Sequence, residues 1–408
     1  MARTTPPREK TDYVGLQRSV AQNHLKTEVA KKERHSIKDF ITTTIWKWLR
    51  YYIKNRFGRK AAYPSYVGED KGIYPLEEGG LVGIVSDWAT DTDESCAIIT
   101  RMGEFNPGYT VHVGDTYFVG APSEIEANFL DEDCPWVRGY KGSFALLGNH
   151  EMYSRGIAFF AKLLPTLGMQ LPNGNYAGQG AGFFCLQNEH WRVLGLDTGY
   201  HSIGKFPFLE MLWLFEPDCR LPTTVMDWLR TEVKLGDPAD KRGLVILTHH
   251  QYMSAFMGQK ERMKPAEQLA ELIGTERPVI WIWGHEHKFA LYQKAQAGKG
   301  ITAYGRCIGN GGMPVELKSK EFIRVPLKKG SDKLVMVDTR LSDDGFGYNG
   351  YAMLKVSGAE LVIQYYDSKQ LLVEEAWTHT GGTIAGRINY TSEVLQTEKG
   401  KKWEDAVG

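Results

Sequence analysis

The chain has 408 residues, of which 42% are hydrophobic and 24% are charged, as in an ordinary globular protein. This length allows one large domain with an extension, or two domains, and the lack of a run of 18 apolar residues argues against a membrane-spanning helix. The net charge is zero but uneven, because residues 1–60 hold 15 Lys and Arg against 5 Asp and Glu. The remainder is therefore acidic.

The cysteines and the N-terminus bear on the cellular compartment. The five cysteines are scattered, odd in number, and form no Cys-x-x-Cys pair: Cys96, Cys134, Cys185, Cys219 and Cys307. We therefore expect no disulfide framework and a reduced, cytoplasmic setting. The N-terminus has no apolar segment typical of a secretory signal, which fits the same expectation.

Residues 37–57 are predicted to form an amphipathic helix within a basic extension and linker covering residues 1–75. Apolar residues recur there at helical spacing, and the polar face carries lysines and an arginine. We favour a helix packed on its own domain. The alternatives are a helix lying on a membrane surface and a helix that docks a protein partner.

From residue 81 onward, five short apolar runs each end in Asp, Asn or His. They are residues 81–86 before Asp87, 109–113 before Gly114-Asp115, 145–147 before Gly148-Asn149-His150-Glu151, 244–248 before His249-His250, and 279–283 before Gly284-His285-Glu286-His287. Apolar runs of this kind indicate buried central strands, and α/β sheets bind ligands beyond the carboxyl ends of such strands. Oxygen and imidazole groups gathered there are typical of a metal site.

Other segments complete an α/β pattern. Helices are predicted at 93–102, 122–130, 156–167, 223–234 and 265–272, and hairpins at 182–196 and 351–366. The first hairpin indicates a second, partly antiparallel sheet. We assign the main domain to residues 76–385 and a tail to 386–408. The almost wholly apolar segment 206–215 is read as a loop buried in the fold, with a hydrophobic lid or contact patch as the alternative.

The series Asp87, Gly114-Asp115, Gly148-Asn149-His150-Glu151, His249 and Gly284-His285-Glu286-His287 resembles the calcineurin-like metallophosphoesterases in composition and order. The resemblance spans roughly residues 80–310. It implies a four-layer α-β-β-α sandwich with two mixed sheets, in which the C-terminal hairpin joins the second sheet. It also implies a two-metal site, with Fe, Mn, Zn or Co as candidate ions.

By the same resemblance, one metal takes Asp87, Asp115 and His287, and the other takes Asp115, Asn149, His249 and His285. The pair would clamp the phosphoryl oxygens and activate a bridging hydroxide for in-line attack. His150 would act on the phosphate rather than on metal, oriented by Glu151 or another acid.

Several neighbouring residues keep alternative interpretations. His250 is an equal candidate to His249 by composition, and only the family pattern favours His249. Glu286 is expected to face solvent or to support the ligands rather than to bind metal. His112 is expected in the core, and Asp197 either touches the site or caps a turn.

The first motif departs from the family. Asp87-Trp88-Ala89 replaces the common Asp-x-His and resembles the purple acid phosphatase branch, where a tyrosine three residues after the bridging aspartate compensates. Phe118 takes that place here, and Tyr117 precedes it. Side chains alternate in an extended segment, so Tyr117 reaches the metal only if the backbone turns. From Phe118 we expect no visible iron–phenolate band.

Taken together, the sequence predicts a cytoplasmic, metal-dependent phosphoesterase acting on a small-molecule phosphate mono- or diester. The alternative is a binding or scaffold protein with the same fold that works through the basic helix and the apolar segment. The number of converging polar groups favours the enzyme. The acidic balance outside the extension disfavours nucleic acid as substrate.

Overall fold

The computed structural model describes residues 59–203, 217–257, 259–315, 327, 332–343 and 345–395. The helix predicted at 37–57 and the apolar segment 206–215 lie outside these ranges, so both predictions stand as they were made. None of the described helices is long and apolar enough to cross a membrane.

The first sheet, here the β2 sheet, contains eight strands in the order β16-β15-β14-β13-β2-β3-β4-β5. These are β2 (Leu81–Val85), β3 (Tyr109–His112), β4 (Gly142–Ala145), β5 (Gly168–Met169), β13 (Gly350–Ser357), β14 (Glu360–Asp367), β15 (Leu371–Thr380) and β16 (Thr383–Thr391). The central strands β2, β3 and β4 are parallel, and the C-terminal strands extend the sheet in antiparallel fashion.

The second sheet, here the β8 sheet, has the order β1-β6-β7-β8-β9-β11-β10-β12. Its strands are β1 (Ile73–Pro75), β6 (Phe184–Gln187), β7 (Trp191–Gly195), β8 (Gly243–Thr248), β9 (Val279–Trp283), β10 (Phe289–Gln296), β11 (Thr302–Ile308) and β12 (Leu334–Val337). Strands β6 and β7 form the predicted antiparallel hairpin, while β7, β8 and β9 run parallel. Both sheets are therefore mixed, as the family resemblance implied.

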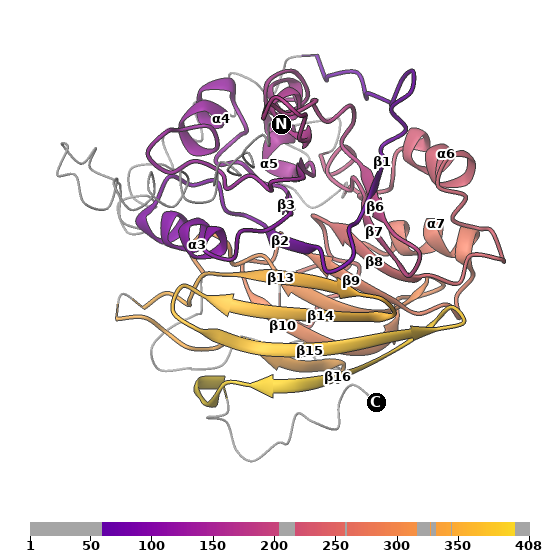
Figure 1. Ribbon diagram of the computed structural model, residues 1–408. Coiled ribbons are helices and arrows are strands. Elements are labelled where there is room, and N and C mark those ends of the chain that lie inside the picture. Colours follow the sequence, from indigo (N-terminus) through magenta and orange to yellow (C-terminus); the bar gives the residue numbers. More distant parts are fainter. Residues whose placement is uncertain are drawn as a thin grey trace, which may run out of the picture.

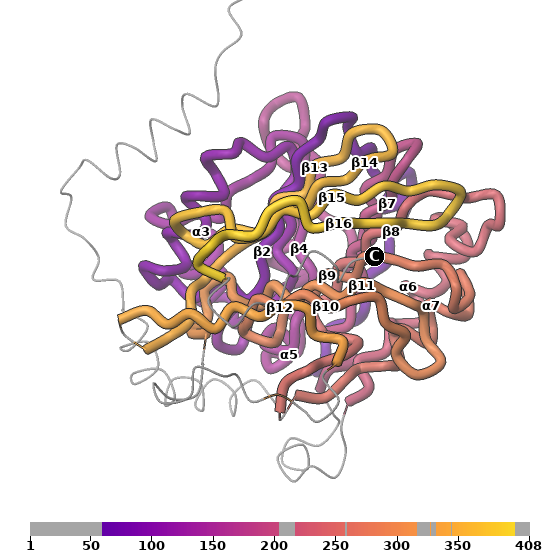
Figure 2. The backbone as a smooth tube through the Cα atoms, turned by 90° about the horizontal axis from the view of Figure 1, so that it is seen from below, coloured from indigo at the N-terminus to yellow at the C-terminus, as the bar shows by residue number. Residues whose placement is uncertain are grey.

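Three apolar clusters define four layers. One fills the space between the two sheets and includes Val82, Ile84 and Val245. A second packs the β8 sheet against α6 (Thr223–Thr231) and α7 (Met263–Ile273), and a third packs the β2 sheet against α3 (Asp93–Gly103), α4 (Pro122–Asn128) and α5 (Asn149–Tyr153). Helices α3–α5 and α6–α7 lie on opposite sides in Figure 1, and Figure 2 shows β13–β16 and β9–β12 as separate layers. The predicted α-β-β-α sandwich is confirmed, and cover on both faces explains why the central strands are apolar throughout.

The C-terminal part corrects two predictions. The hairpin β13–β14 joins β2 rather than the sheet that holds the β6–β7 hairpin. Strand β16 runs to Thr391 and pairs with β15, and a short 3₁₀ helix follows at Glu393–Leu395. The tail predicted from residue 386 therefore starts too early, because Gly386 interrupts the alternating apolar positions of β16 and weakens its hydrophobic signal.

The helix predicted at 156–167 is only partly regular. Phe159–Leu163 forms a single π-helical turn, and Leu164–Thr166 forms a 3₁₀ turn that contains Pro165. Pro165 has no backbone N–H to donate within this turn, which fits the loss of the regular helical hydrogen-bond pattern at this end.

One disulfide departs from the expectation drawn from cysteine spacing. Cys96 in α3 is bonded to Cys134, which follows α4. The remaining cysteines, Cys185, Cys219 and Cys307, are free and buried. The two bonded residues are 38 positions apart, so no short sequence motif predicts that they pair.

A buried ion pair joins the two sheets through the central cluster. Arg306 on β11 donates to Glu375 on β15 from Nε (2.7 Å) and from Nη2 (2.5 Å). Tyr365 also donates to the same carboxylate at 2.9 Å. Both charged side chains are almost inaccessible to solvent, so neither can exchange its partner for water.

This pair yields a stability prediction. Arg306→Met should lower the free energy of unfolding by about 3–5 kcal/mol, because it leaves the Glu375 carboxylate buried without its cation. Chemical denaturation followed by circular dichroism measures the loss. The double variant Arg306→Met/Glu375→Leu should recover most of it, since apolar groups then replace both charges.

The control removes an exposed ion pair. Lys264 lies 3.2 Å from Glu267 on the surface of α7. Lys264→Met should change the free energy of unfolding by less than about 1 kcal/mol. An Arg306→Met variant as stable as the wild type would contradict the importance of the buried pair.

Candidate metal centre

The predicted ligand residues come together at the carboxyl ends of strands from both sheets. Asp87 follows β2, Asp115 follows β3, and Asn149 opens α5 after β4. His249 follows β8 and His285 follows β9. The sandwich therefore delivers groups that are as much as 198 positions apart in the sequence to one place.

Close backbone packing brings these loops together. A Cβ on Gly148 would lie 2.1 Å from Asp115 Oδ1, and a Cβ on Gly284 would lie 1.8 Å from Ser86 Oγ. Any other residue at these two positions would push the Asp115 or Asp87 loop out of place. The glycines in the sequence motifs thus allow the ligand loops to pack close together, because they have no side chain.

Three of the ligand residues have left-handed backbone conformations. The φ angles are 58° at Asp87, 70° at Asp115 and 62° at His285. This region is uncommon for residues other than glycine and is typical of functional sites, where the surroundings hold the strained residue in place.

Each carboxylate is held by one oxygen and presents the other. Asp87 Oδ2 accepts hydrogen bonds from Ser86 Oγ (2.6 Å) and the His285 amide (2.9 Å). Asp115 Oδ1 accepts one from the His150 amide at 2.9 Å. Asp87 Oδ1 and Asp115 Oδ2 are therefore the carboxylate oxygens that can bind a metal ion.

The amide and imidazole on the other side are oriented in the same way. Asn149 Nδ2 donates to Tyr153 Oη at 3.3 Å, which turns its Oδ1 inward. His249 Nδ1 lies 2.9 Å from the carbonyl oxygen of Val113, which can only accept, so Nε2 is left as the inward lone pair. Partners of this kind commonly fix the tautomer of a metal-binding histidine.

The inward atoms form a chain of contacts with Asp115 in the middle. His249 Nε2 lies 3.1 Å from Asn149 Oδ1 and 3.1 Å from Asp115 Oδ2. On the other side, Asp115 Oδ2 lies 3.3 Å from Tyr117 Oη. The central position of Asp115 is the one that a residue shared by two metals requires.

Tyr117 completes the second half of this chain. Its hydroxyl lies 2.7 Å from Asp87 Oδ1 and 3.0 Å from His287 Nε2, and its side chain is buried. The segment is not extended at Asp115, where φ is 70°, and the Tyr117 hydroxyl lies among the ligand groups. The sequence pattern left this open, because an alternating extended segment does not predict the turn.

His150 lies beside the ligands. Its Nδ1 lies 2.6 Å from the carbonyl oxygen of Phe118, and its Nε2 lies 3.8 Å from Asp115 Oδ2. The partner that orients it is thus a main-chain carbonyl rather than Glu151, which was expected. Glu151 instead accepts from the amides of Gly148 (2.9 Å) and Thr116 (2.5 Å), and so holds the loops together.

Glu286, His112 and Asp197, whose roles the sequence left open, are all buried in the structure. Glu286 is buried and accepts from Ser254 Oγ and from Trp283 Nε1 at 3.0 Å, so it supports the loop between His285 and His287. His112 is a core histidine, as expected, and packs edge-on against Phe129. Asp197 is buried and caps a turn by accepting from the Tyr200 amide at 2.9 Å.

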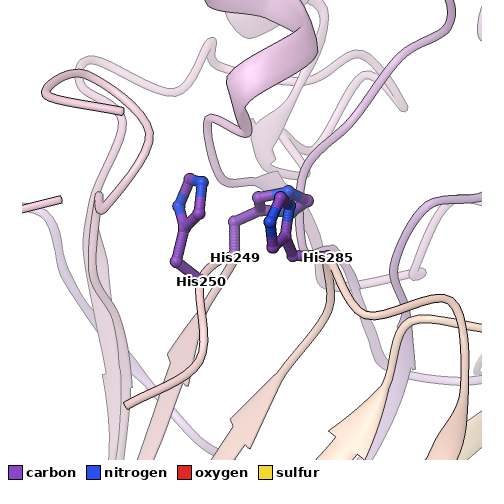
Figure 3. Close-up of side chains that lie close together, drawn as sticks. All are labelled: His249, His250 and His285. Atoms are coloured by element: carbon purple, nitrogen blue, oxygen red, sulfur yellow. The ribbon is translucent and has the colours of Figure 1, made fainter. Parts of the chain in front are cut away.

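His249 and His250 are both close to His285, as Figure 3 shows. A ring nitrogen of each of the three lies within 4.8 Å of one in the other two. Only His249 belongs to the contact chain with Asp115 and Asn149. Asp87, Asp115 and His249 form a second group with the same spacing.

The electrostatics of the centre are dominated by its two buried aspartates. Burial by itself raises the pKa of Asp87, but the hydrogen bond with His287 and the charge of His249 lower it below the usual value. Burial likewise opposes the charge of Asp115, yet His249 and His150 bring its pKa well below the usual range. Burial lowers the pKa of His249, and the Asp115 carboxylate outweighs this and raises it to about 9.

These residues fit a pair of metal ions. The inward Asp87 and Asp115 oxygens, the Asn149 oxygen and the His249 nitrogen are all electron-pair donors crowded within hydrogen-bond distances, and a cation relieves their repulsion. The high pKa of His249 means that a proton takes this role when no metal does. Mixed oxygen and imidazole donors suit Fe, Mn, Zn or Co.

Comparison with known proteins agrees with this geometry. A model of the calcineurin-like phosphoesterase family matches residues 81–289, just over half of the chain. The chain therefore belongs to this family. No curated protein sequence gave a significant match.

Similar solved structures include phosphatases. A purple acid phosphatase from yellow lupin (Lupinus luteus) is 12% identical with a TM-score of 0.43, and the match covers 74% of this chain and 54% of the lupin chain. The chain thus spans about half the length of that enzyme. A dimetal phosphatase from Danio rerio is 12% identical with a TM-score of 0.43, covering 74% of this chain and all of its own. Vps29 from Chaetomium thermophilum is 10% identical with a TM-score of 0.25, covering 77% and 97%.

The position of Tyr117 reverses the expectation about colour. Because its hydroxyl lies among the groups assigned to the first metal, the protein loaded with iron(III) should show a visible phenolate-to-iron band. Absorption spectra of the loaded wild type and of Tyr117→Phe test this, and the band should vanish in the variant. Phe118→Leu is the matched control and should keep it. A colourless wild type with full iron content would place Tyr117 outside the metal ligands.

Proposed function

We propose that this protein hydrolyses a phosphate mono- or diester of a small molecule at a two-metal site. The observation that carries the proposal is the contact chain from Asn149 through His249, Asp115 and Tyr117 to Asp87, with Asp115 Oδ2 at its centre. Membership of the calcineurin-like phosphoesterase family supports the same reaction class.

The ligand division follows the two halves of the chain. Asp87, His287 and Tyr117 would hold one ion, Asn149, His249 and His285 the other, and Asp115 would contact both. When bound, two such ions supply positive charge to the phosphoryl oxygens and lower the pKa of the attacking water.

We propose His150 as the residue that handles a proton. The Phe118 carbonyl occupies its Nδ1, so Nε2 is the nitrogen turned toward the centre. The side chain is 17% exposed, which leaves a path for a substrate to reach it. We infer that Nε2 holds a proton for the leaving oxygen or donates a hydrogen bond to the phosphoryl group.

The alternative function as a scaffold depends on residues 37–57 and 206–215, which lie outside the described part of the chain. Within the described residues, the converging buried donors favour hydrolysis, since burying two carboxylates is costly without a cation. A scaffold protein that binds no metal would gain nothing to offset the destabilisation from burying these two carboxylates.

The first test of the proposal concerns the shared ligand. Asp115→Asn should reduce hydrolysis of a chromogenic phosphate ester by about a thousandfold or more, because the site loses the charge that both ions need. Elemental analysis of the same sample should show lowered metal content. Turnover near the wild-type rate with unchanged metal content would rule out the two-metal site.

The second test concerns His150. His150→Ala should keep its metal content but lose about 10²–10⁴ in rate, because proton transfer is lost while the ligands stay in place. The loss should shrink for esters with very good leaving groups if His150 acts as the acid. Metal content that falls together with the rate would instead make His150 a ligand.

A further inference from the structure

His250 is buried beside the candidate metal centre but is not part of the contact chain. Its side chain is 3% exposed, and its ring lies 4.8 Å from the ring of His249 and 4.7 Å from that of His285, measured between centroids. Figure 3 shows it standing next to these two rings. It lies in the loop that follows β8. Such a position is costly for a polar side chain unless its nitrogens have partners.

One ring nitrogen of His250 is held by Thr198. Nδ1 lies 3.1 Å from Thr198 Oγ1, and the same hydroxyl oxygen accepts from the His250 amide at 3.0 Å. Thr198 is itself fully buried in the loop that follows β7. The imidazole is therefore fixed in place by the loop that follows the neighbouring strand β7.

These contacts select the tautomer of the ring. The Thr198 hydroxyl already accepts the amide proton, and among the described residues its own proton has one acceptor, His250 Nδ1. If Nδ1 carried a proton instead, the hydroxyl would be a buried donor without a partner, at a substantial cost. The neutral ring therefore carries its proton on Nε2.

The Nε2–H group makes no hydrogen bond to any described residue, whereas the other polar groups of His250 are paired. A nitrogen that carries a proton cannot bind a metal ion, so the geometry separates His250 from His249, whose inward nitrogen has a lone pair. What remains is a fixed donor on a ring that lies beside the rings of His249 and His285.

We propose that His250 is a substrate-binding residue, whose Nε2–H donates a hydrogen bond to an anionic oxygen of the phosphoryl group. The inference rests on the proposed function, because it takes the ligand to be a phosphate group bound between the loops after β8 and β9. In this proposal His250 contacts the phosphoryl group from the β8 sheet, and His150 contacts it from the β2 sheet on the other side. Donors already aimed at developing charge cost no reorganisation during reaction.

Two amide substitutions separate the two ring nitrogens. In His250→Gln the side-chain amide reaches the place of Nε2 and can donate there, whereas in His250→Asn it reaches only the place of Nδ1 and keeps the contact with Thr198. The probe is inorganic phosphate, titrated calorimetrically into each metal-loaded protein. His250→Asn should weaken phosphate binding by about ten- to hundredfold, as expected for a lost hydrogen bond to a charged group, and His250→Gln by about threefold or less.

Metal content measured on the same samples distinguishes the competing roles. It should be unchanged in both variants. Metal lost from either variant would make His250 a ligand and overturn the proposal, as would equal phosphate affinity in wild type and His250→Asn. His190→Gln is the matched control, because His190 lies in the turn before β7, at the far end of that strand from Thr198, and it should bind phosphate as the wild type does.

The experiment does not depend on turnover. A wild type that binds metal and phosphate but hydrolyses no ester would contradict the proposed function, while the ratio of affinities between His250→Asn and His250→Gln would still decide the role of His250. A wild type that takes up neither metal nor phosphate would overturn both.

Discussion

The centre depends on the burial of two carboxylates close together. Asp87 and Asp115 are inaccessible to solvent, and each turns one oxygen toward the same tyrosine hydroxyl. Two negative charges in such a place are stable only with positive charge beside them. The histidines around them supply part of it when protonated, and metal ions would supply the rest. Everything else in the site is arranged about this pair.

The fold serves this pair by holding each ligand from behind. Each ligand has a hydrogen-bond partner on the atom that faces away from the centre, which orients its other polar atom toward the centre. These partners are Ser86, Val113, Tyr153 and the amides of His150 and His285. Because these supports follow strands of both sheets, the site requires the sandwich to be assembled. The buried Arg306–Glu375 pair contributes to that assembly from within the central cluster.

Much of this could be predicted from the sequence. The apolar runs before Asp87, Asp115, His249 and His285 predicted the strands and the gathering of these residues at the strand ends. The sandwich was implied by the resemblance to the calcineurin-like metallophosphoesterases. The inward turn of Tyr117, the carbonyl that orients His150 and the role of Thr198 could not be predicted, because each depends on a loop conformation or on a contact between distant strands. The Cys96–Cys134 disulfide and the strand β16 were missed for lack of a local pattern.

The most direct test of the account is anomalous X-ray diffraction from crystals of the metal-loaded protein. The account predicts two peaks on either side of the Asp115 carboxylate, one bordered by Asp87 and His287 and the other by Asn149, His249 and His285. A protein loaded with excess metal that shows no peak there, or a single peak that Asp115 does not contact, would contradict it.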